Sequence, residues 1–315
     1  YGYTEKMDAA YMRDTITPIG ENRLLPVTVQ TYQTAVDKIS YEIRSLDAQR
    51  LIANADVTSY TENKGMISME LPIQNLLEKN EEYLLVIQLE SGDRMICYYT
   101  RIIESQNSYV SECIDFVRQF NDTTFDSEKA SSLSTYMEKT TGDNTTLQYV
   151  TLNNSLNQVS WAEFHGTRLT TPVPSVKEIT PTYNVIVQDY VVTRVGQNGQ
   201  SEYYNVEEYY RVRYTNTRMY LLNFERTMEE IFRGENDSIS GNDILLGIRS
   251  KDVEYQTNES GKVVAFVQEG ELWSYNQEAN TLAKVFSFRG YEGVDDRENY
   301  GEHDIKIVNI DEAGS

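Results

Sequence analysis

Four acidic residues near the end of the sequence carry the oxygen chemistry that calcium prefers. Asp295, Asp296, Glu298 and Asp304 fall within ten positions, in the stretch GVDDRENYGEHD. Carboxylate oxygens at such short spacing are hard ligands that can hold Ca²⁺. The stretch lacks the spacing of an EF-hand, so a solvated acidic loop is the main alternative. The sequence therefore assigns no metal or cofactor, and calcium at this stretch is the one candidate.

Aromatic rings are the second candidate for chemistry, because tyrosine is unusually frequent. The chain has 24 Tyr against 9 Phe and 2 Trp. Adjacent tyrosines on a strand point to opposite faces, so one face of the segment at 203–220 would bury its rings. The other face would display rings for stacking on a sugar or on a partner protein. Tyr204, Tyr210 and Trp273 are the candidate ligand-stacking residues, and packing in the protein interior is the alternative for all three.

The remaining inventory for catalysis is small. Two His and two Cys are present, without a CxxC or HExxH motif, which argues against the common zinc sites. Cys97 and Cys113 lie on apolar faces and are predicted to be free, buried thiols. Paired carboxylates could serve a glycosidase, but among 49 acidic residues no local motif selects a pair. We assign no catalytic residue, and the balance is against an enzyme.

The elements that would position these residues begin with six strand-like segments within residues 24–105. In KISYEIRSL, the residues Ile39, Tyr41 and Ile43 share one face and polar residues share the other, as in a sheet exposed on one side. Turn signals about every 8–12 residues are typical of a β-sandwich. The segments ISYEIRSLDAQRLI and NEEYLLVIQLESGDRMICYYTRI resemble hairpins of an immunoglobulin-like or fibronectin type III-like module. This resemblance implies a spacer or binding role without catalytic residues.

Residues 106–236 are predicted to form an α+β domain. Apolar residues at three- and four-residue steps predict helices over 109–120 and 127–137. A helix pair followed by a long meander favours helices packed on one face of an antiparallel sheet. The strand-like runs after the helices are 147–152, 156–164, 183–195, 202–215 and 218–227.

The two ends of the chain lie outside these domains. Residues 1–23 are interpreted as a polar lead-in segment with a short helix at 5–13. Residues 237–315 are predicted to form a β-meander, and its densest part, 252–288, has four strand-like runs separated by tight turns. Its core VVAFVQEGELWSYN resembles one blade of a TolB-like β-propeller, and residues 303–315 would open a second blade. Since propellers close with about four to eight blades, the alternative is a small sheet packed on the preceding domain.

Composition limits the classes of function. The 28 Lys+Arg and 49 Asp+Glu residues give a net charge of −21, which opposes binding to nucleic acid and to anionic lipid headgroups. No run reaches the roughly 18 apolar residues of a transmembrane helix. The first residue is Tyr1 rather than Met, so a signal peptide or anchor would already be absent. Frequent Tyr, Thr and Asn with two cysteines indicate an extracytoplasmic bacterial protein, secreted or membrane-anchored.

We therefore expect a multidomain, mainly β protein with an α+β middle. Its expected role is binding or scaffolding in the cell envelope, with an envelope protein or a glycan as partner. One alternative is an extracytoplasmic hydrolase acting on glycans or peptides, which two carboxylates about 5–10 Å apart in a concave pocket would favour. The other alternative is a ligand-sensing ectodomain, which a pocket in the α+β domain would favour.

Overall fold

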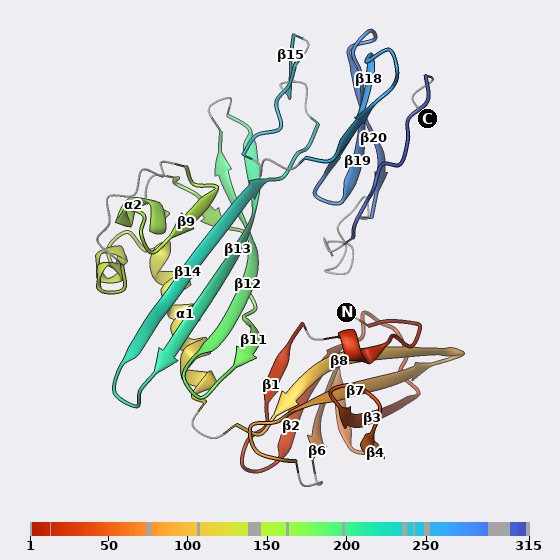
Figure 1. Ribbon diagram of the computed structural model, residues 1–315, viewed down its shortest axis with the longest axis vertical. Coiled ribbons are helices and arrows are strands. Elements are labelled where there is room, and N and C mark those ends of the chain that lie inside the picture. The colour runs from red at the N-terminus through yellow and green to blue at the C-terminus, as the bar shows by residue number, and fades with distance from the viewer. Residues whose placement is uncertain are drawn as a thin grey trace. The chain divides into compact units, whose positions relative to one another are not determined.

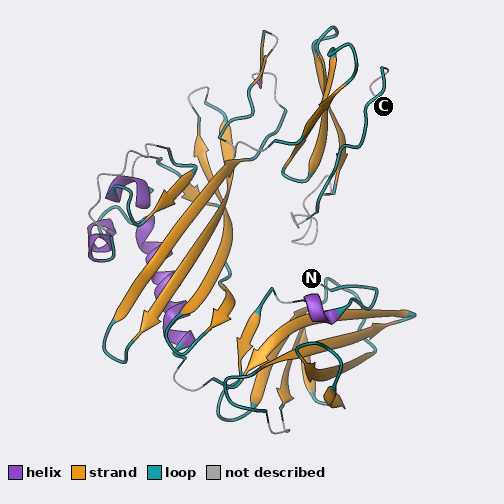
Figure 2. Ribbon diagram, viewed as in Figure 1, coloured by secondary structure: helices purple, strands orange, loops and turns teal. Residues whose placement is uncertain are grey.

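The computed structural model shows a mainly β chain with few helices (Figures 1 and 2). The chain divides into two compact units, each built from segments that are separate in the sequence. Unit 1 comprises Tyr1–Asp122, Val173–Gln188 and Tyr209–Phe224, and unit 2 comprises Thr123–Pro172, Asp189–Glu208 and Glu225–Ser315. The structure describes residues 2–12, 14–73, 77–105, 108–137, 146–161, 164–196, 199–234, 238–241, 243–248, 253–288 and 303–312.

The first part of unit 1 consists of two β-sheets. One sheet has the strand order β1-β8-β7-β3-β4, and the other has the order β2-β6-β5. Every pair is antiparallel except β1 with β8. These sheets fit the β-sandwich predicted from the alternation. The strands are β1 (Ile16–Pro18), β2 (Leu24–Gln30), β3 (Lys38–Ser45), β4 (Leu51–Asp56), β5 (Tyr60–Asn63), β6 (Met66–Pro72), β7 (Glu82–Ser91) and β8 (Arg94–Ile103).

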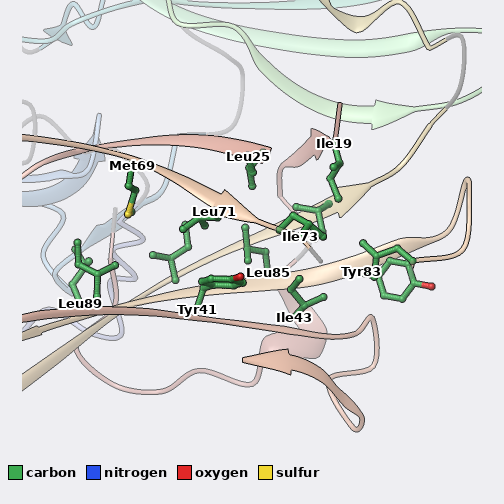
Figure 3. Packing of buried hydrophobic residues seen from close by; sticks show 14 of the residues in the cluster. Ile19, Leu25, Tyr41, Ile43, Met69, Leu71, Ile73, Tyr83, Leu85 and Leu89 are labelled. Carbon is green, nitrogen blue, oxygen red and sulfur yellow. The ribbon is translucent and has the colours of Figure 1, made fainter. Parts of the chain in front are cut away.

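Side chains from both sheets meet in one hydrophobic core (Figure 3). Tyr41 and Ile43 of β3 and Met69 and Leu71 of β6 are buried in it, as alternation along each strand requires. The polar end of the buried Tyr41 side chain has a hydrogen-bond partner, because its hydroxyl donates to the carbonyl oxygen of Pro72 at 2.6 Å. Each fully buried aliphatic side chain contributes about 1.5–3 kcal/mol, so this core holds the two sheets together.

The N-terminal segment takes part in this core. β1 pairs in parallel with β8, and Ile16 and Ile19 are 2% and 5% exposed. The helix predicted at 5–13 is a single 3-10 turn over Ala9–Tyr11, which begins at an Asp8 cap. A parallel strand is specified by distant pairing rather than by a local turn, which explains why the sequence pattern did not indicate β1.

We expect residues 14–105 to fold alone and to be more stable than residues 24–105. The shorter fragment loses β1 and the buried side chains of Ile16 and Ile19. Circular dichroism melts should therefore show a β spectrum for both fragments, with a melting temperature higher by about 10 °C in the longer one. Equal melting temperatures would show that β1 adds no stability, and a helical spectrum would contradict the sandwich.

The middle of the chain forms a helix and a six-stranded sheet. Helix α1 (Val110–Thr124) confirms the predicted helical spacing. In unit 1, Phe120 of α1 packs against Tyr210 and Phe224, with ring centroids 5.7 and 5.2 Å apart. The sheet has the order β10-β12-β13-β14-β9, and β11 pairs with β12. Its strands are β9 (Tyr149–Thr151), β10 (Thr167–Arg168), β11 (Ser175–Ile179), β12 (Asn184–Val195), β13 (Ser201–Tyr214) and β14 (Met219–Glu230).

Two predicted elements differ from those observed. The strand predicted at 156–164 is wrong, because Leu156–Val159 forms the short helix α2. Its cause is a capping box, in which the Ser155 hydroxyl accepts the backbone N–H of Gln158 and the Gln158 side chain accepts the backbone N–H of Ser155. The helix predicted at 127–137 is instead a 3-10 helix over Ala130–Thr135.

A buried guanidinium holds α2 in unit 2. Arg226 of β14 is 0% exposed. It donates to the carbonyl oxygens of Val159 at 2.9 Å and of Gln158 at 2.5 Å. Its Cζ also lies 3.9 Å from the centroid of the Trp161 ring, within the range of a cation–π interaction. These contacts fix the end of α2 and the following Trp161 to the sheet.

We expect the substitution Arg226→Met to lower the free energy of unfolding of unit 2 by about 3 kcal/mol. The reason is that the buried carbonyl oxygen of Val159 and the partly buried one of Gln158 lose their donors, at about 1–3 kcal/mol for each buried group. Urea unfolding followed by the fluorescence of Trp161 and Trp273, both in unit 2, measures this loss. In the control Arg118→Met, the exposed ion pair with Asp115 is removed and the change should stay below about 0.5 kcal/mol. Equal losses in the two variants would contradict the anchoring role.

The last sheet is a four-stranded antiparallel meander in unit 2. Its order β17-β18-β19-β20 confirms the four strands predicted within 252–288. The tight turns contain Gly261 and Gly270 at φ angles of 71° and 70°, which glycine adopts at low cost. The strands are β17 (Tyr255–Thr257), β18 (Val263–Gln268), β19 (Glu271–Asn276) and β20 (Thr281–Ser287), preceded by the short hairpin of β15 (Ile239–Ser240) and β16 (Asp243–Ile244).

Other segments of unit 2 cover both faces of this meander. Phe266 packs with Phe232 in one buried cluster, and Val263 packs with Ile310 in another. The described residues 303–312 form no strand, so the second blade strand predicted there is wrong for this part of the chain. Ile307 and Ile310 of that segment instead pack on one face of the sheet, which explains why both faces of β18 are apolar.

Candidate functional site

A cavity of about 220 Å³ lies in unit 2. One side is lined by Gln200 and the first residues of β13, 201–203, and by the last residue of β14 with the three residues after it, 230–233. Ser238 and residues 245–247 line the rest. The two strands remain paired here, since the backbone N–H of Ile231 donates to the carbonyl oxygen of Tyr203 at 2.7 Å. The sheet therefore fixes the positions of the side chains that line one side of the cavity.

Glu202 is held in one orientation at this cavity. Its Oε2 accepts hydrogen bonds from Arg194 Nε and from the Tyr204 hydroxyl, both at 2.6 Å, whereas its Oε1 accepts none from the described residues. Burial would raise the pKa of Glu202, but the hydrogen bonds from Tyr204 and Arg194 outweigh burial and lower it. Burial and the bond to Glu202 in turn raise the pKa of Tyr204. Glu202 is thus a fixed carboxylate anion with one acceptor oxygen left for a ligand.

Glu230 is the second carboxylate at the cavity. It shares a sheet face with Tyr204, because Met228, two residues earlier, packs in the same buried cluster as Tyr204. Its Oε2 accepts the backbone N–H of Ile248 at 3.1 Å. Gly247 has a φ of 77°, and a Cβ added there would overlap the Glu230 carboxylate. Glycine at 247 therefore lets the backbone lie directly against this acid.

Aromatic side chains and one more guanidinium complete the lining. Arg233 places its Cζ 5.1 Å from the centroid of the Tyr203 ring. Phe232 lines the cavity and meets Trp273 edge to face, with ring centroids 5.0 Å apart. Leu245 adds an apolar side chain that is 68% exposed.

The described charged residues that line the cavity are Glu202, Glu230 and Arg233, and Arg194 pairs with Glu202 from outside the lining. Glu202 is paired with Arg194 at 2.6 Å, and Glu230 lines the same cavity as Arg233. Polar residues outnumber apolar ones in the lining, so hydrogen bonds would contribute more to ligand binding here than apolar contact. With two acids and two guanidinium groups, the site suits a neutral ligand with hydroxyl or amide groups better than an ion.

The aromatic and cysteine residues singled out from the sequence lie in the interior. Tyr204 and Tyr210 are both 0% exposed, and Trp273 is 5% exposed. Their rings are covered by protein, which was the alternative to ligand stacking, and Tyr204 serves the cavity through its hydroxyl instead. Cys97 and Cys113 are free and buried, as predicted.

The calcium candidates lie mostly outside the described residues. This holds for Asp295, Asp296 and Glu298, while Asp304 is described and exposed. Across the part of the chain that the structure describes, no group of three or more His, Cys, Asp or Glu side chains is placed to hold a metal ion. The calcium site therefore stays a prediction from the sequence.

Of the residues that line the cavity, sequence reasoning singled out Tyr203, as part of the tyrosine-rich segment, but neither of the two acids. One signal was present for Glu202, which stands two positions before Tyr204 and so shares its face on a strand. Glu230 and Gly247 are brought together by pairing across the sheet and by the path of the chain after β14. No local sequence pattern predicts that these residues lie close together, so only the structure identifies them.

The comparisons with known proteins found no match. No protein-family model, no curated protein and no solved structure matches this chain. Among the residues described, no helix is both long enough and apolar enough to cross a membrane. The site is therefore interpreted from its own geometry.

The lowered pKa of Glu202 makes stability depend on pH. Its folded-state pKa lies below the ordinary 4.5, so its stabilising effect is complete above pH 4.5 and is lost as the pH falls through the folded-state value. We expect Glu202→Gln to cost about 1 kcal/mol of unfolding free energy at neutral pH and progressively less in acid. Urea unfolding across the acidic range measures this. The control Glu207→Gln changes an exposed acid on the same strand, and the same pH profile in both variants would contradict the assignment.

Proposed function

We propose that the chain is an extracytoplasmic protein of the bacterial cell envelope that binds a glycan through the cavity at 200–247. The observation that carries this proposal is the Glu202 carboxylate, which lines a small cavity and is held in place by Arg194 and Tyr204. Neutral sugars present many hydroxyl groups and a hydrophobic ring face, so they need acceptors, donors and an apolar contact together. The cavity supplies all three.

Each kind of contact has a residue at the cavity. Glu202 Oε1 is an acceptor for a sugar hydroxyl, and a bond to an ionised carboxylate is stronger than one to a neutral acceptor. The guanidinium of Arg233 is a donor group, and Leu245 and Phe232 supply apolar surface. Because Glu202 is already held by Arg194 and Tyr204, ligand binding does not have to order it, which lowers the entropic cost.

The hydrolase alternative rests on the same two carboxylates, Glu202 and Glu230. A glycosidase needs one carboxyl group of its pair protonated as the general acid, and hence a raised pKa. The pKa of Glu202 is shifted in the opposite direction. Glu202 therefore does not suit the general acid, and the hydrolase alternative would need Glu230 in that role with the ionised Glu202 as base or nucleophile. A ligand-sensing ectodomain would use the same cavity and would differ in passing a signal onward once the ligand is bound.

We also propose roles for the two modules suggested by resemblance. Two packed antiparallel sheets support an immunoglobulin-like or fibronectin type III-like spacer over 24–105. A sequential four-stranded meander supports a blade-like sheet over 252–288. Both fit a modular envelope protein that presents its binding site away from an anchor.

The substitution Leu245→Arg tests the glycan proposal. It places a long charged side chain at the cavity, and Leu245 is 68% exposed, so the fold should tolerate it. The control Leu169→Arg changes a leucine of unit 2 that is 56% exposed and does not line the cavity. We expect neutral oligosaccharides of cell-wall composition, screened on an array and titrated by calorimetry, to bind the unsubstituted chain and Leu169→Arg alike. Affinity should fall at least about tenfold in Leu245→Arg.

Three outcomes would contradict the proposal. The absence of binding to every neutral oligosaccharide would remove the glycan as ligand. Equal loss of affinity in both leucine variants would show that the oligosaccharide does not bind at the cavity. Release of reducing sugar, abolished by Glu202→Gln and by Glu230→Gln, would favour the hydrolase.

A further inference from the structure

The end of the β13–β14 hairpin differs in charge from the rest of the chain. Residues 209–224, all in unit 1, include Arg211, Arg213 and Arg218 and no acidic residue, in a chain with 49 acids and a net charge of −21. We call this segment the basic hairpin. Its turn is closed by the backbone N–H of Thr215, which donates to the carbonyl oxygen of Arg218 at 3.1 Å.

Tyrosine rings hold the arginines of the basic hairpin. The Cζ atoms of Arg213 and Arg218 lie 4.9 and 5.0 Å from the centroid of the Tyr220 ring. Arg211 lies 5.0 Å from the ring of Tyr183. Arg213 and Arg218 are exposed, and neither forms an ion pair with any described residue. Arg213 and Arg218 are therefore held by a ring without being neutralised by an ion pair.

A guanidinium stacked on a ring keeps its N–H edge available. The ring covers one face of the planar group, and the N–H donors lie in the plane, where they match the oxygens of a phosphate in pairs. Arg213 and Arg218 lie over the same ring, that of Tyr220, whereas Arg211 lies over Tyr183. The two exposed guanidinium groups at Tyr220 offer two sets of N–H donors, which neighbouring phosphate groups of a surface can occupy at once.

We propose that the basic hairpin docks on the phosphate headgroups of an anionic phospholipid bilayer. Arginine near a bilayer surface is attracted to anionic lipid, and tyrosine is enriched at the level of the headgroups. The turn residues Thr215, Asn216 and Thr217 are exposed and polar, so the hairpin lies among headgroups without inserting an apolar side chain. Repulsion from the other charges of the chain is screened beyond a Debye length of about 10 Å.

Vesicle co-sedimentation of the full chain tests this proposal. The probes are phosphatidylcholine vesicles with and without phosphatidylglycerol. We expect binding to the anionic vesicles, weakened by salt, and a partition coefficient about 30-fold lower in the double variant Arg213→Gln/Arg218→Gln. The matched control Arg50→Gln/Arg94→Gln removes the same charge from exposed positions of the sandwich and should bind nearly as the unsubstituted chain does. Circular dichroism melts should be alike in all three proteins, which shows that the hairpin variant is folded.

Three results would overturn the proposal. The first is no binding of the unsubstituted chain to anionic vesicles at any salt concentration. The second is equal loss in the two double variants, since a general charge effect would then explain binding. The third is binding of a polyglutamate peptide through Arg213 and Arg218 without vesicle binding, which would assign the basic hairpin to an acidic protein partner. None of these results depends on the glycan cavity.

Discussion

The buried guanidinium of Arg226 is the interaction on which the candidate site depends. Its Cζ lies 3.9 Å from the centroid of the Trp161 ring. The ring centroids of Trp161 and Phe164 are 5.3 Å apart, and those of Phe164 and Tyr204 are 4.9 Å apart. The Tyr204 hydroxyl then donates to Glu202 at 2.6 Å. Each contact is a packed ring or a hydrogen bond, so the position of the Glu202 carboxylate is set by a continuous chain of buried groups that begins at α2. A buried charge is tolerated when polar partners surround it, and here those partners also fix the site.

The strands could be predicted from the sequence because their pattern is local. Alternation identified the core face of β3 and the long strands of the meander. The sequence of α2 contains a helix signal, Ser155 followed three positions later by Gln158, but the apolar residues within LNQVSWAEF favour a strand. β1 and the segment 303–312 were not predictable in this way, since both are defined by residues far away in the sequence.

The candidate site was less predictable than the fold for the same reason. Glu202 and Glu230 are 28 positions apart in the sequence, and both line the cavity because β13 pairs with β14. Gly247 lies against Glu230 in a segment after β14 whose position cannot be predicted from strand alternation. The two acids also look alike among 49 in the sequence. Their environments distinguish them: one carboxylate is held by a guanidinium and a phenol, and the other by a backbone N–H. Burial and partners, rather than residue type, give each acid its chemistry.

Aromatic rings in the middle of the chain have a structural role that the sequence alone did not indicate. Seven arginines between residues 168 and 233 lie over aromatic rings, and they are all the arginines of that segment: Arg168, Arg194, Arg211, Arg213, Arg218, Arg226 and Arg233. Rings that were candidates for stacking on a ligand are thus used on the chain's own cations. Ring contacts orient a guanidinium without cancelling its charge, unlike ion pairs. The net charge of −21 therefore describes the average surface, while Arg213 and Arg218 lie over a ring and form no ion pair with the described residues.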